Sequence, residues 1–311
     1  MKNQQRIRPL VEGAFLGALV LVLSFFSLYV PFSALIITFI WPVPIIVLGV
    51  RHGMKLAIMS TVVVAILSGI LFHPFLLLMT LLGFGFVGVI IGGSLEEGFA
   101  PVKTLSLGAG ASFFSQLLLL WLGVRVMGFH PLEEMERAFE QVLTLYANLG
   151  VSTDMIQQLD TMLAEQMNLI LFLFPAFFLI SALVTTTGTY YVSCQVLKKL
   201  GHQVSFLKPF HQWRFPRQLG LFFVLTFVLS LFYEHPVLNN MLVVLLFLFF
   251  IQGLSVSYAL IKNYIGGKWP LLLLLVLFLF LSFIVLQLLI IIGLADMGLN
   301  LREKIGKKPK K

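Results

Sequence analysis

The sequence predicts an all-α fold, a polytopic membrane helix bundle of about nine transmembrane helices, or alternatively eight, with an extracytoplasmic amphipathic helical hairpin. The composition is 59% hydrophobic and only 11% charged, and the mean hydropathy is +1.01, both outside the range of soluble domains. Many apolar runs reach the roughly 20 residues that cross a hydrocarbon core of about 30 Å. The runs lack strict alternation, which favours helices over barrel strands because lipid satisfies no backbone hydrogen bonds.

Nine apolar segments are expected to span the membrane, at residues 12–30, 34–50, 54–72, 75–93, 104–126, 166–197, 217–233, 237–261 and 269–294. The first is interpreted as an uncleaved span, because its apolar stretch from Val11 to Val30 is too long for a signal peptide. The second is the weakest, since Trp41-Pro42-Val43-Pro44 interrupts it. If that segment is re-entrant, eight spans remain.

The charged residues place the N-terminus in the cytoplasm, because Lys and Arg gather on the cytoplasmic side of membrane proteins. Besides the N-terminal cations, the expected inner turns carry Arg51, Lys55, Lys103, Lys198, Lys199, Lys208, Arg214, Arg217, Lys262 and Lys268. The loop after the fifth span is acidic, with Arg137 as its one clear cation. The tail disagrees, since nine spans would put its Lys and Arg residues outside; either the short final tail has little influence on topology, or one segment is re-entrant. The net charge of +8 is therefore interpreted as membrane orientation in a lipid bilayer, and no nucleic-acid partner is expected.

The hydrophilic stretch at 131–165 predicts two helices that form an outer hairpin. In the first helix, apolar residues recur at steps of three and four, at Leu132, Met135, Phe139, Val142, Tyr146 and Leu149. Pro131 stands near the first turn, and Gly150 is expected to end the helix. One of residues 152–154 then caps a second helix that leads into the sixth span. The hairpin is either a solvated linker with one packed face or a lid or partner-binding surface.

Small residues in the first span form two neighbouring strips, Gly13 with Gly17 and Ala14 with Ala18. Small residues four apart let another helix approach closely, which matters in lipid because no hydrophobic effect drives helices together. Two interpretations stay open for these strips. They pack inside the bundle, or they dock a separate protein.

Polar residues at membrane depth are the candidates for a ligand site, because burying such groups costs free energy and they normally face the bundle interior. Gln116 and Arg125 lie in the fifth span, and Asn168 and Phe172 begin a stripe along the sixth. The stripe continues through Pro175, Leu179, Ala182, Thr186, Thr189 and Ser193. Packing between helices is the alternative for that stripe, and the alternative for Arg125 is a charge that extends to the outer membrane interface. The predicted substrate-binding residues are Gln116, Arg125, Asn168 and Phe172, for an unknown small molecule.

Several activities lack the residues that they need. Gly266-Gly267-Lys268 has neither the upstream glycine nor the following Ser or Thr of a phosphate-binding loop, so the chain itself is not expected to be an ATPase. The six histidines stand at segment ends without metal-ligand spacing, and neither a metal nor another cofactor is expected. No catalytic grouping lies inside a span, so the protein is not expected to be an enzyme. Cys194 is interpreted as a packing residue.

Two polar features remain in the last third of the chain. The stretch from Lys208 to Arg217 mixes aromatic and cationic residues, which is typical of an anchor at the membrane interface. Gln252 and Gln287 are expected to face the bundle interior.

Three stretches resemble the YybS-like family of bacterial membrane proteins: residues His211–Pro216, Ile251–Ser255 and Gly293–Arg302. The resemblance covers nearly the full chain and implies the bacterial cytoplasmic membrane. The first two-thirds is also similar to the substrate-binding S subunits of energy-coupling-factor vitamin transporters. Those subunits have six spans and an Ala-xxx-Ala pair in the first helix, here Ala14 and Ala18, which contacts a transmembrane coupling subunit.

This similarity implies a division into three parts: a six-helix module at 1–200 that includes the outer hairpin at 131–165, three further helices at 201–295, and a basic tail at 296–311. The further helices have no counterpart in a minimal S subunit. Two functions therefore compete. Transport with a coupling subunit and its ATPases predicts a ligand-sized cavity open outward near Arg125 and Asn168, whereas a membrane scaffold predicts a bundle filled by its own Phe and Leu side chains.

Overall fold

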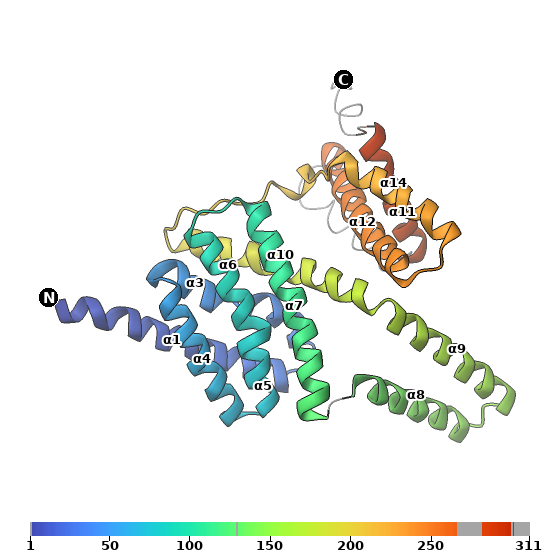
Figure 1. Cartoon of the computed structure of the whole chain (residues 1–311), viewed down its shortest axis with the longest axis horizontal. Coiled ribbons are helices and arrows are strands. Elements are labelled where there is room, and N and C mark those ends of the chain that lie inside the picture. The colour runs from blue at the N-terminus through green and yellow to red at the C-terminus, as the bar shows by residue number, and fades with distance from the viewer. Residues whose placement is uncertain (1, 129, 266–281, 300, 302–311) are drawn as a thin grey trace. The chain divides into compact units, whose positions relative to one another are not determined.

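A computed structural model describes residues 2–128, 130–265, 282–299 and 301, and it contains only helices, turns and irregular segments within them (Figure 1). The predicted all-α class is confirmed. Within the described residues, seven helical stretches are long and apolar enough to cross a membrane: Ile7–Tyr29, Ser33–His52, Met54–Leu71, Pro74–Glu96, Pro101–Met127, Phe174–Lys199 and Pro236–Lys262. Two shorter apolar helices follow, at Arg217–Phe232 and Ile284–Leu299. The start of the ninth expected span and most of the basic tail lie outside the described residues.

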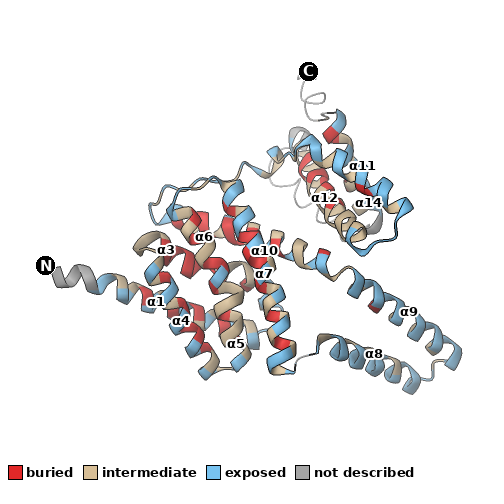
Figure 2. Ribbon diagram, in the orientation of Figure 1, coloured by how far each residue is buried: buried red, intermediate tan, exposed pale blue. Residues whose placement is uncertain are grey.

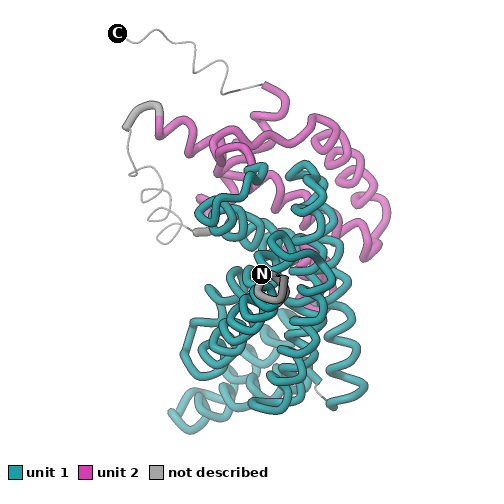
Figure 3. The backbone as a smooth tube through the Cα atoms, turned by 90° about the vertical axis from the view of Figure 1, so that its left-hand side faces the viewer, with its two compact units in different colours: residues 1–168, 181–206 teal, residues 169–180, 207–311 magenta. Residues whose placement is uncertain are grey.

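The chain divides into two compact units (Figure 3). Unit 1 comprises Met1–Asn168 and Ser181–Phe206, and unit 2 comprises Leu169–Ile180 and Leu207–Lys311. One short piece of the sixth span thus belongs with the last third of the chain. The division expected from the sequence, at residue 200, stays a prediction.

The centre of unit 1 is α3 (Val43–His52), in which every residue from Val43 to Gly49 is buried. The neighbouring helices α1 (Lys2–Tyr29), α4 (Met54–Leu71) and α6 (Phe86–Glu96) pack around it, and Figure 2 shows these buried residues in red. The span that the sequence marked as weakest is therefore the most buried of the seven long helical stretches. It is broken in two, because Trp41-Pro42 separates α2 (Ser33–Ile40) from α3.

The fourth span is irregular as well. It consists of α5 (Pro74–Leu78), a π-helical turn η1 (Met79–Gly85) and α6. A π-helical turn holds one extra residue per turn, frees backbone groups and is frequent at functional sites. Unit 1 therefore contains two spans whose regular hydrogen bonding is interrupted.

The polar end of the sixth-span stripe, Thr186, Thr189 and Ser193, faces inward on α10 (Phe174–Lys199). Thr186, Thr189 and Ser193 are at most 1% exposed, and a Cβ on Gly108 of α7 (Pro101–Met127) would lie 2.7 Å from the methyl carbon of Thr186. These residues lie in the packed contact between α7 and α10. This agrees with the alternative that the stripe serves packing between helices.

The sixth span begins later than expected. The sequence predicted one span from 166, but α9 (Thr153–Phe172) ends and α10 begins at Phe174, directly before Pro175. Proline supplies no backbone N–H, so the ladder of hydrogen bonds breaks there. Asn240 fills the break, because its Oδ1 accepts from Ala176 N at 2.9 Å and its Nδ2 donates to the carbonyl of Phe172 at 2.8 Å.

Unit 2 is built on α11 (Arg217–Phe232), α12 (Pro236–Ile265) and α14 (Ser282–Leu299). The last two cross at Gly253 and Gly293. A Cβ on Gly253 would overlap the carbonyl oxygen of Leu289, and one on Gly293 would overlap that of Phe249. Only glycine permits this backbone contact.

Candidate functional site

The two strips of small residues on α1 face different surroundings. Gly13 and Gly17 are buried, whereas Ala14 and Ala18 are exposed. A Cβ on Gly17 would lie 2.8 Å from a methyl carbon of Val64 on α4, so this strip holds α1 against the bundle. The sequence left packing and docking open for both strips. The structure assigns packing to the glycines and leaves the alanines on the outer surface of unit 1.

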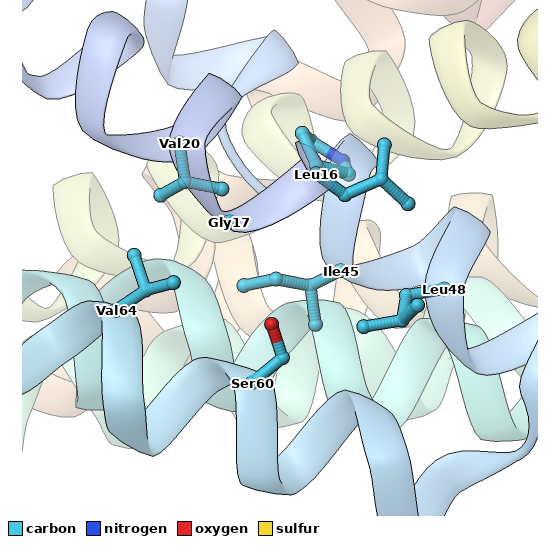
Figure 4. Close-up of a pocket in the computed structure, with 8 residues that line it drawn as sticks. Leu16, Gly17, Val20, Ile45, Leu48, Ser60 and Val64 are labelled. Atoms are coloured by element: carbon cyan, nitrogen blue, oxygen red, sulfur yellow. The ribbon is translucent and has the colours of Figure 1, made fainter. Parts of the chain in front are cut away.

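A small apolar notch lies beside the glycine strip (Figure 4). Its empty volume is about 170 Å³, including space open to the outside, and its interior has no room for a water molecule. Leu16, Gly17 and Val20 of α1 line one side, while Ile45, Leu48 and Val64 from α3 and α4 line the other. The notch is a seam between helices and not a ligand cavity.

A charged cluster fixes the start of α1 on α3. Glu12 forms an ion pair with Arg51, and its Oε2 lies 2.8 Å from Nε2 of His52. The three side chains are between 16% and 26% exposed. Because one carboxylate is held from two neighbouring residues of α3, the rotation of α1 about its axis is set, and with it the outward face of the alanine strip.

The two interrupted spans of unit 1 meet. The indole ring of Trp41, at the break between α2 and α3, stacks on Phe84 of η1 with ring centroids 4.1 Å apart. Ser115 of α7 donates to the carbonyl of Leu82 at 2.5 Å, which satisfies a backbone acceptor of the π-helical turn. Trp41 Nε1 and Thr80 Oγ1 are buried and form no hydrogen bond with any described residue. Polar groups and irregular backbone are thus concentrated within the most buried part of unit 1.

The predicted ligand residues do not form a cluster joined by hydrogen bonds. Gln116 donates to Ser112 on its own helix at 3.1 Å, and Arg125 and Asn168 are exposed. Phe172 belongs to unit 2, where its carbonyl accepts from Asn240. No hydrogen bond or ion pair links these four described side chains to one another. Their role in ligand binding stays a prediction.

Unit 2 brings together the three stretches that carried the resemblance to the YybS-like family. Gln252 of α12 accepts from the backbone N–H of Phe215 at 2.9 Å and donates to Oδ2 of Asp296 on α14 at 3.2 Å. Gln252 and Asp296 are each 2% exposed. Buried ionisable and amide side chains within apolar helices usually mark functional positions.

A second anchor holds the same segment. Ser255, one turn along α12, donates to the carbonyl of Phe210 at 2.5 Å and lies 3.3 Å from that of Trp213. The ring of Phe210 packs edge-on against Trp213, with centroids 5.2 Å apart. The connection before α11 is therefore a fixed part of unit 2, here called the strap (residues 207–216).

Sequence reasoning expected Gln252 to face inward, which is confirmed, but Gln287 is exposed. The expectation for Gln287 was wrong because α14 turns its glycine and Asp296 toward α12 and leaves Gln287 on another face. Asp296 was missed as a site residue. The sequence feature that could have identified Asp296 is a carboxylate within an apolar segment, three residues after Gly293.

These features define a class of protein: an integral membrane protein of many apolar helices whose polar side chains are buried between them. Residues 18–297 match the family described as "Predicted membrane protein (DUF2232)", and the chain belongs to that family. It is also similar to "Uncharacterized protein YybS" of Bacillus subtilis (strain 168), with 23% identity over 329 aligned positions that cover 97% of this chain and 99% of the relative. The resemblance to the YybS-like family is confirmed. No solved structure matches the chain.

Proposed function

We propose that the protein is the membrane-embedded binding component of a transporter, similar to the S subunits of energy-coupling-factor transporters, with an unknown small molecule as ligand. The observation that carries the proposal is the division of α1 into a buried Gly13–Gly17 strip and an exposed Ala14–Ala18 strip. Since packing within unit 1 already uses the glycines, the alanines are left for a helix of another protein.

The alanine strip suits a close helix–helix contact. Flanking residues on the same outer surface are large and exposed, with Leu10 at 59% and Phe15 at 70%. Two alanines among such side chains form a flat strip along the helix, into which a partner helix fits closely in lipid. The Glu12 cluster keeps the strip turned outward.

The partner under this proposal is a transmembrane coupling subunit with its ATPases, because the chain has no phosphate-binding loop in its sequence. The protein would lie in the bacterial cytoplasmic membrane with its N-terminus in the cytoplasm, as the distribution of Lys and Arg favours. The alanine strip then stands near the cytoplasmic end of α1, within reach of a coupling subunit.

The two meeting helix interruptions support a binding role for unit 1. Transporters build substrate sites from discontinuous helices, because an interruption exposes backbone groups that can contact a ligand inside the membrane. Trp41 and Thr80 would supply donors at such a site, and Gln116, Arg125 and Asn168, which belong to the same unit, remain predicted binding residues.

The deciding experiment is purification of native complexes followed by mass spectrometry. Under the proposal, a coupling subunit and ATPases copurify with the wild-type protein and are lost from the Ala14→Leu plus Ala18→Leu variant. Ala34→Leu is the matched control, because Ala34 is an exposed alanine on α2. Retention of the subunits by the double variant would exclude the strip as their docking site.

A second function, a scaffold that recruits or regulates other proteins, is favoured by the strap. Gln252 and Ser255 hold the strap in place, while Lys208 within it and Arg217 directly after it are exposed. A basic surface held in this way suits a protein partner. Copurification of other proteins without any coupling subunit or ATPase, lost on Lys208→Ala plus Arg217→Ala, would support this alternative.

A further inference from the structure

The outer hairpin is a preformed element with a defined turn. α8 (Pro131–Asn148) begins with proline at its first position. At its end, Gly150 has φ of 80°, Gly150 N bonds to the carbonyl of Ala147, and Val151 N bonds to that of Tyr146. These two bonds are the helix ending that glycine favours in the left-handed conformation. The expected helix limits are thereby confirmed, and α9 follows from Thr153.

The apolar side of this hairpin is largely exposed among the described residues of unit 1. α8 buries none of its 18 residues, and α9 buries only Met167, as the pale blue of both helices in Figure 2 shows. Large apolar side chains are exposed along both helices, at Leu132, Val142, Leu145, Tyr146, Leu149, Met155 and Met162. Of the apolar residues predicted on one face of the first helix, Met135 and Phe139 are half-buried, whereas the other four are exposed: Leu132, Val142, Tyr146 and Leu149. Contiguous apolar surface of this kind marks an interaction site.

The polar side of the hairpin is strongly acidic. Residues 131–165 contain seven acidic side chains, Glu133, Glu134, Glu136, Glu140, Asp154, Asp160 and Glu165, and one arginine, Arg137. Arg137 pairs within α8, at 3.1 Å from Glu134 and 3.5 Å from Glu133. The other five carboxylates form no ion pair with a described residue. Most of this negative charge is therefore available to an outside group.

The exposed apolar surface could be covered by a membrane, by a second copy of this chain or by a partner protein. The acidic charge of the hairpin argues against the first two. Amphipathic helices that lie on membranes are typically rich in Lys and Arg on the polar face, which anionic lipids attract, and this hairpin carries the opposite charge. A second copy would place one acidic hairpin against another, and like charges in contact disfavour association. A partner helix with one apolar face and Lys or Arg on the other would bury the apolar side chains and pair with the carboxylates.

We propose that the hairpin of α8 and α9 docks a cationic amphipathic helix of a partner protein. The apolar face of that helix would cover the exposed apolar side chains of α8 and α9. Lys or Arg residues at the edges of that face would pair with the five carboxylates that have no ion pair in the hairpin. Met155 and Met162 stand seven residues apart on one face of α9, 54% and 63% exposed. Methionine side chains adapt to varied apolar surfaces, so the hairpin tolerates partners that differ in sequence. This binding is independent of the transport proposal.

The test uses the full-length protein in nanodiscs of zwitterionic lipid and a fluorescent amphipathic helical peptide made of leucine and lysine. Anisotropy is expected to show saturable binding beyond that of empty nanodiscs, weakening as salt is raised. The same peptide with glutamate in place of lysine is expected not to bind. Equal binding of both peptides, or no binding of the lysine peptide, would overturn the proposal.

Variants locate the binding on the hairpin. Glu136→Gln plus Glu140→Gln, and separately Met155→Gln plus Met162→Gln, are each expected to weaken binding about tenfold. The matched control is Gln141→Ser plus Gln157→Ser, which changes exposed neutral residues on the same two helices and should leave the affinity unchanged. All six positions are on the outer hairpin, so unchanged melting temperatures are expected. Unchanged affinity in both charge and methionine variants would overturn the proposal.

Two further measurements distinguish the other occupants. In a Leu149→Trp variant without peptide, the emission that the new tryptophan adds to that of the four native tryptophans, read as the difference from the wild type, should be that of a water-exposed indole. A blue shift on incorporation into nanodiscs would show that the bilayer covers the stripe and would overturn the proposal. A dimer that the methionine substitutions dissociate would equally overturn it, in favour of a second copy.

Discussion

Gln252 donates a hydrogen bond to Asp296 over 3.2 Å between two side chains that are each 2% exposed. A backbone N–H only donates hydrogen bonds, so the N–H of Phe215 fixes which end of the Gln252 amide faces the strap. The amide oxygen is then directed to the backbone N–H of Phe215. One side chain therefore ties α12, α14 and the strap together.

The first prediction concerns this amide. Gln252→Leu removes the acceptor of the Phe215 N–H and the donor to Asp296, and a buried polar group that loses its partner costs about 1–3 kcal/mol. The variant should unfold at a lower denaturant concentration, and protease should cut the strap sooner. Gln287→Leu is the control, because Gln287 is exposed on α14. Equal stability of the two variants would show that the hydrogen bonds do not stabilise unit 2.

The second prediction concerns the glycine crossing. In Gly293→Ala the new methyl group would overlap the carbonyl of Phe249 and lie 2.9 Å from Gly253 N. Backbone atoms cannot move aside as side chains do, so α12 and α14 must separate, and overpacking of this kind costs about 1–3 kcal/mol. A thermal melt in detergent should show the loss. Gly298→Ala on the same helix meets no atom within 4 Å and should be neutral, and an equal loss there would contradict the mechanism.

The third prediction separates the two strips of α1. Gly17→Leu places a bulky side chain where a Cβ alone comes within 2.8 Å of Val64, so the variant should be destabilised and express poorly. Ala18→Leu adds the same side chain on the exposed face and should melt like the wild type. Equal destabilisation by both substitutions would mean that the alanine strip is also buried.

Sequence reasoning succeeded where one residue type decides the local structure. Apolar length gave the long spans, and Pro131 and Gly150 gave the limits of α8, because proline and glycine act through their own backbone geometry. The two strips of small residues on α1 were recognised from the sequence. Which strip is buried depends on the helices that pack beside α1, and the sequence alone does not show which helices those are.

The missed features depend on contacts between distant segments. The sixth span was expected to run unbroken from 166, yet it breaks at Leu173. Pro175 stands next to this break, but the side chain that bonds to the backbone on both sides of it, Asn240, lies 64 residues from Ala176. Likewise, the Gln252–Asp296 pair joins residues 44 positions apart. Such pairs become visible only when the helices are packed.

The last prediction concerns the helix break. Asn240 accepts from Ala176 N and donates to the carbonyls of Phe172 and of Pro236 on its own helix. In Asn240→Leu, the Ala176 N–H loses its acceptor, and a direct bond to Phe172 would require the helix to straighten against the packing of Ala176, which is 1% exposed. The Ala176 amide should therefore exchange hydrogen faster.

Hydrogen exchange read by mass spectrometry, on peptides that cover residues 172–180, checks this expectation. Asn239→Leu is the matched control, because that neighbouring asparagine shows no side-chain hydrogen bond in the described structure. If exchange in the Asn240 variant matched that of the control, the break would be maintained by Pro175 alone. Faster exchange confined to the Asn240 variant would identify the inserted amide as the group that stabilises the backbone at the break between α9 and α10.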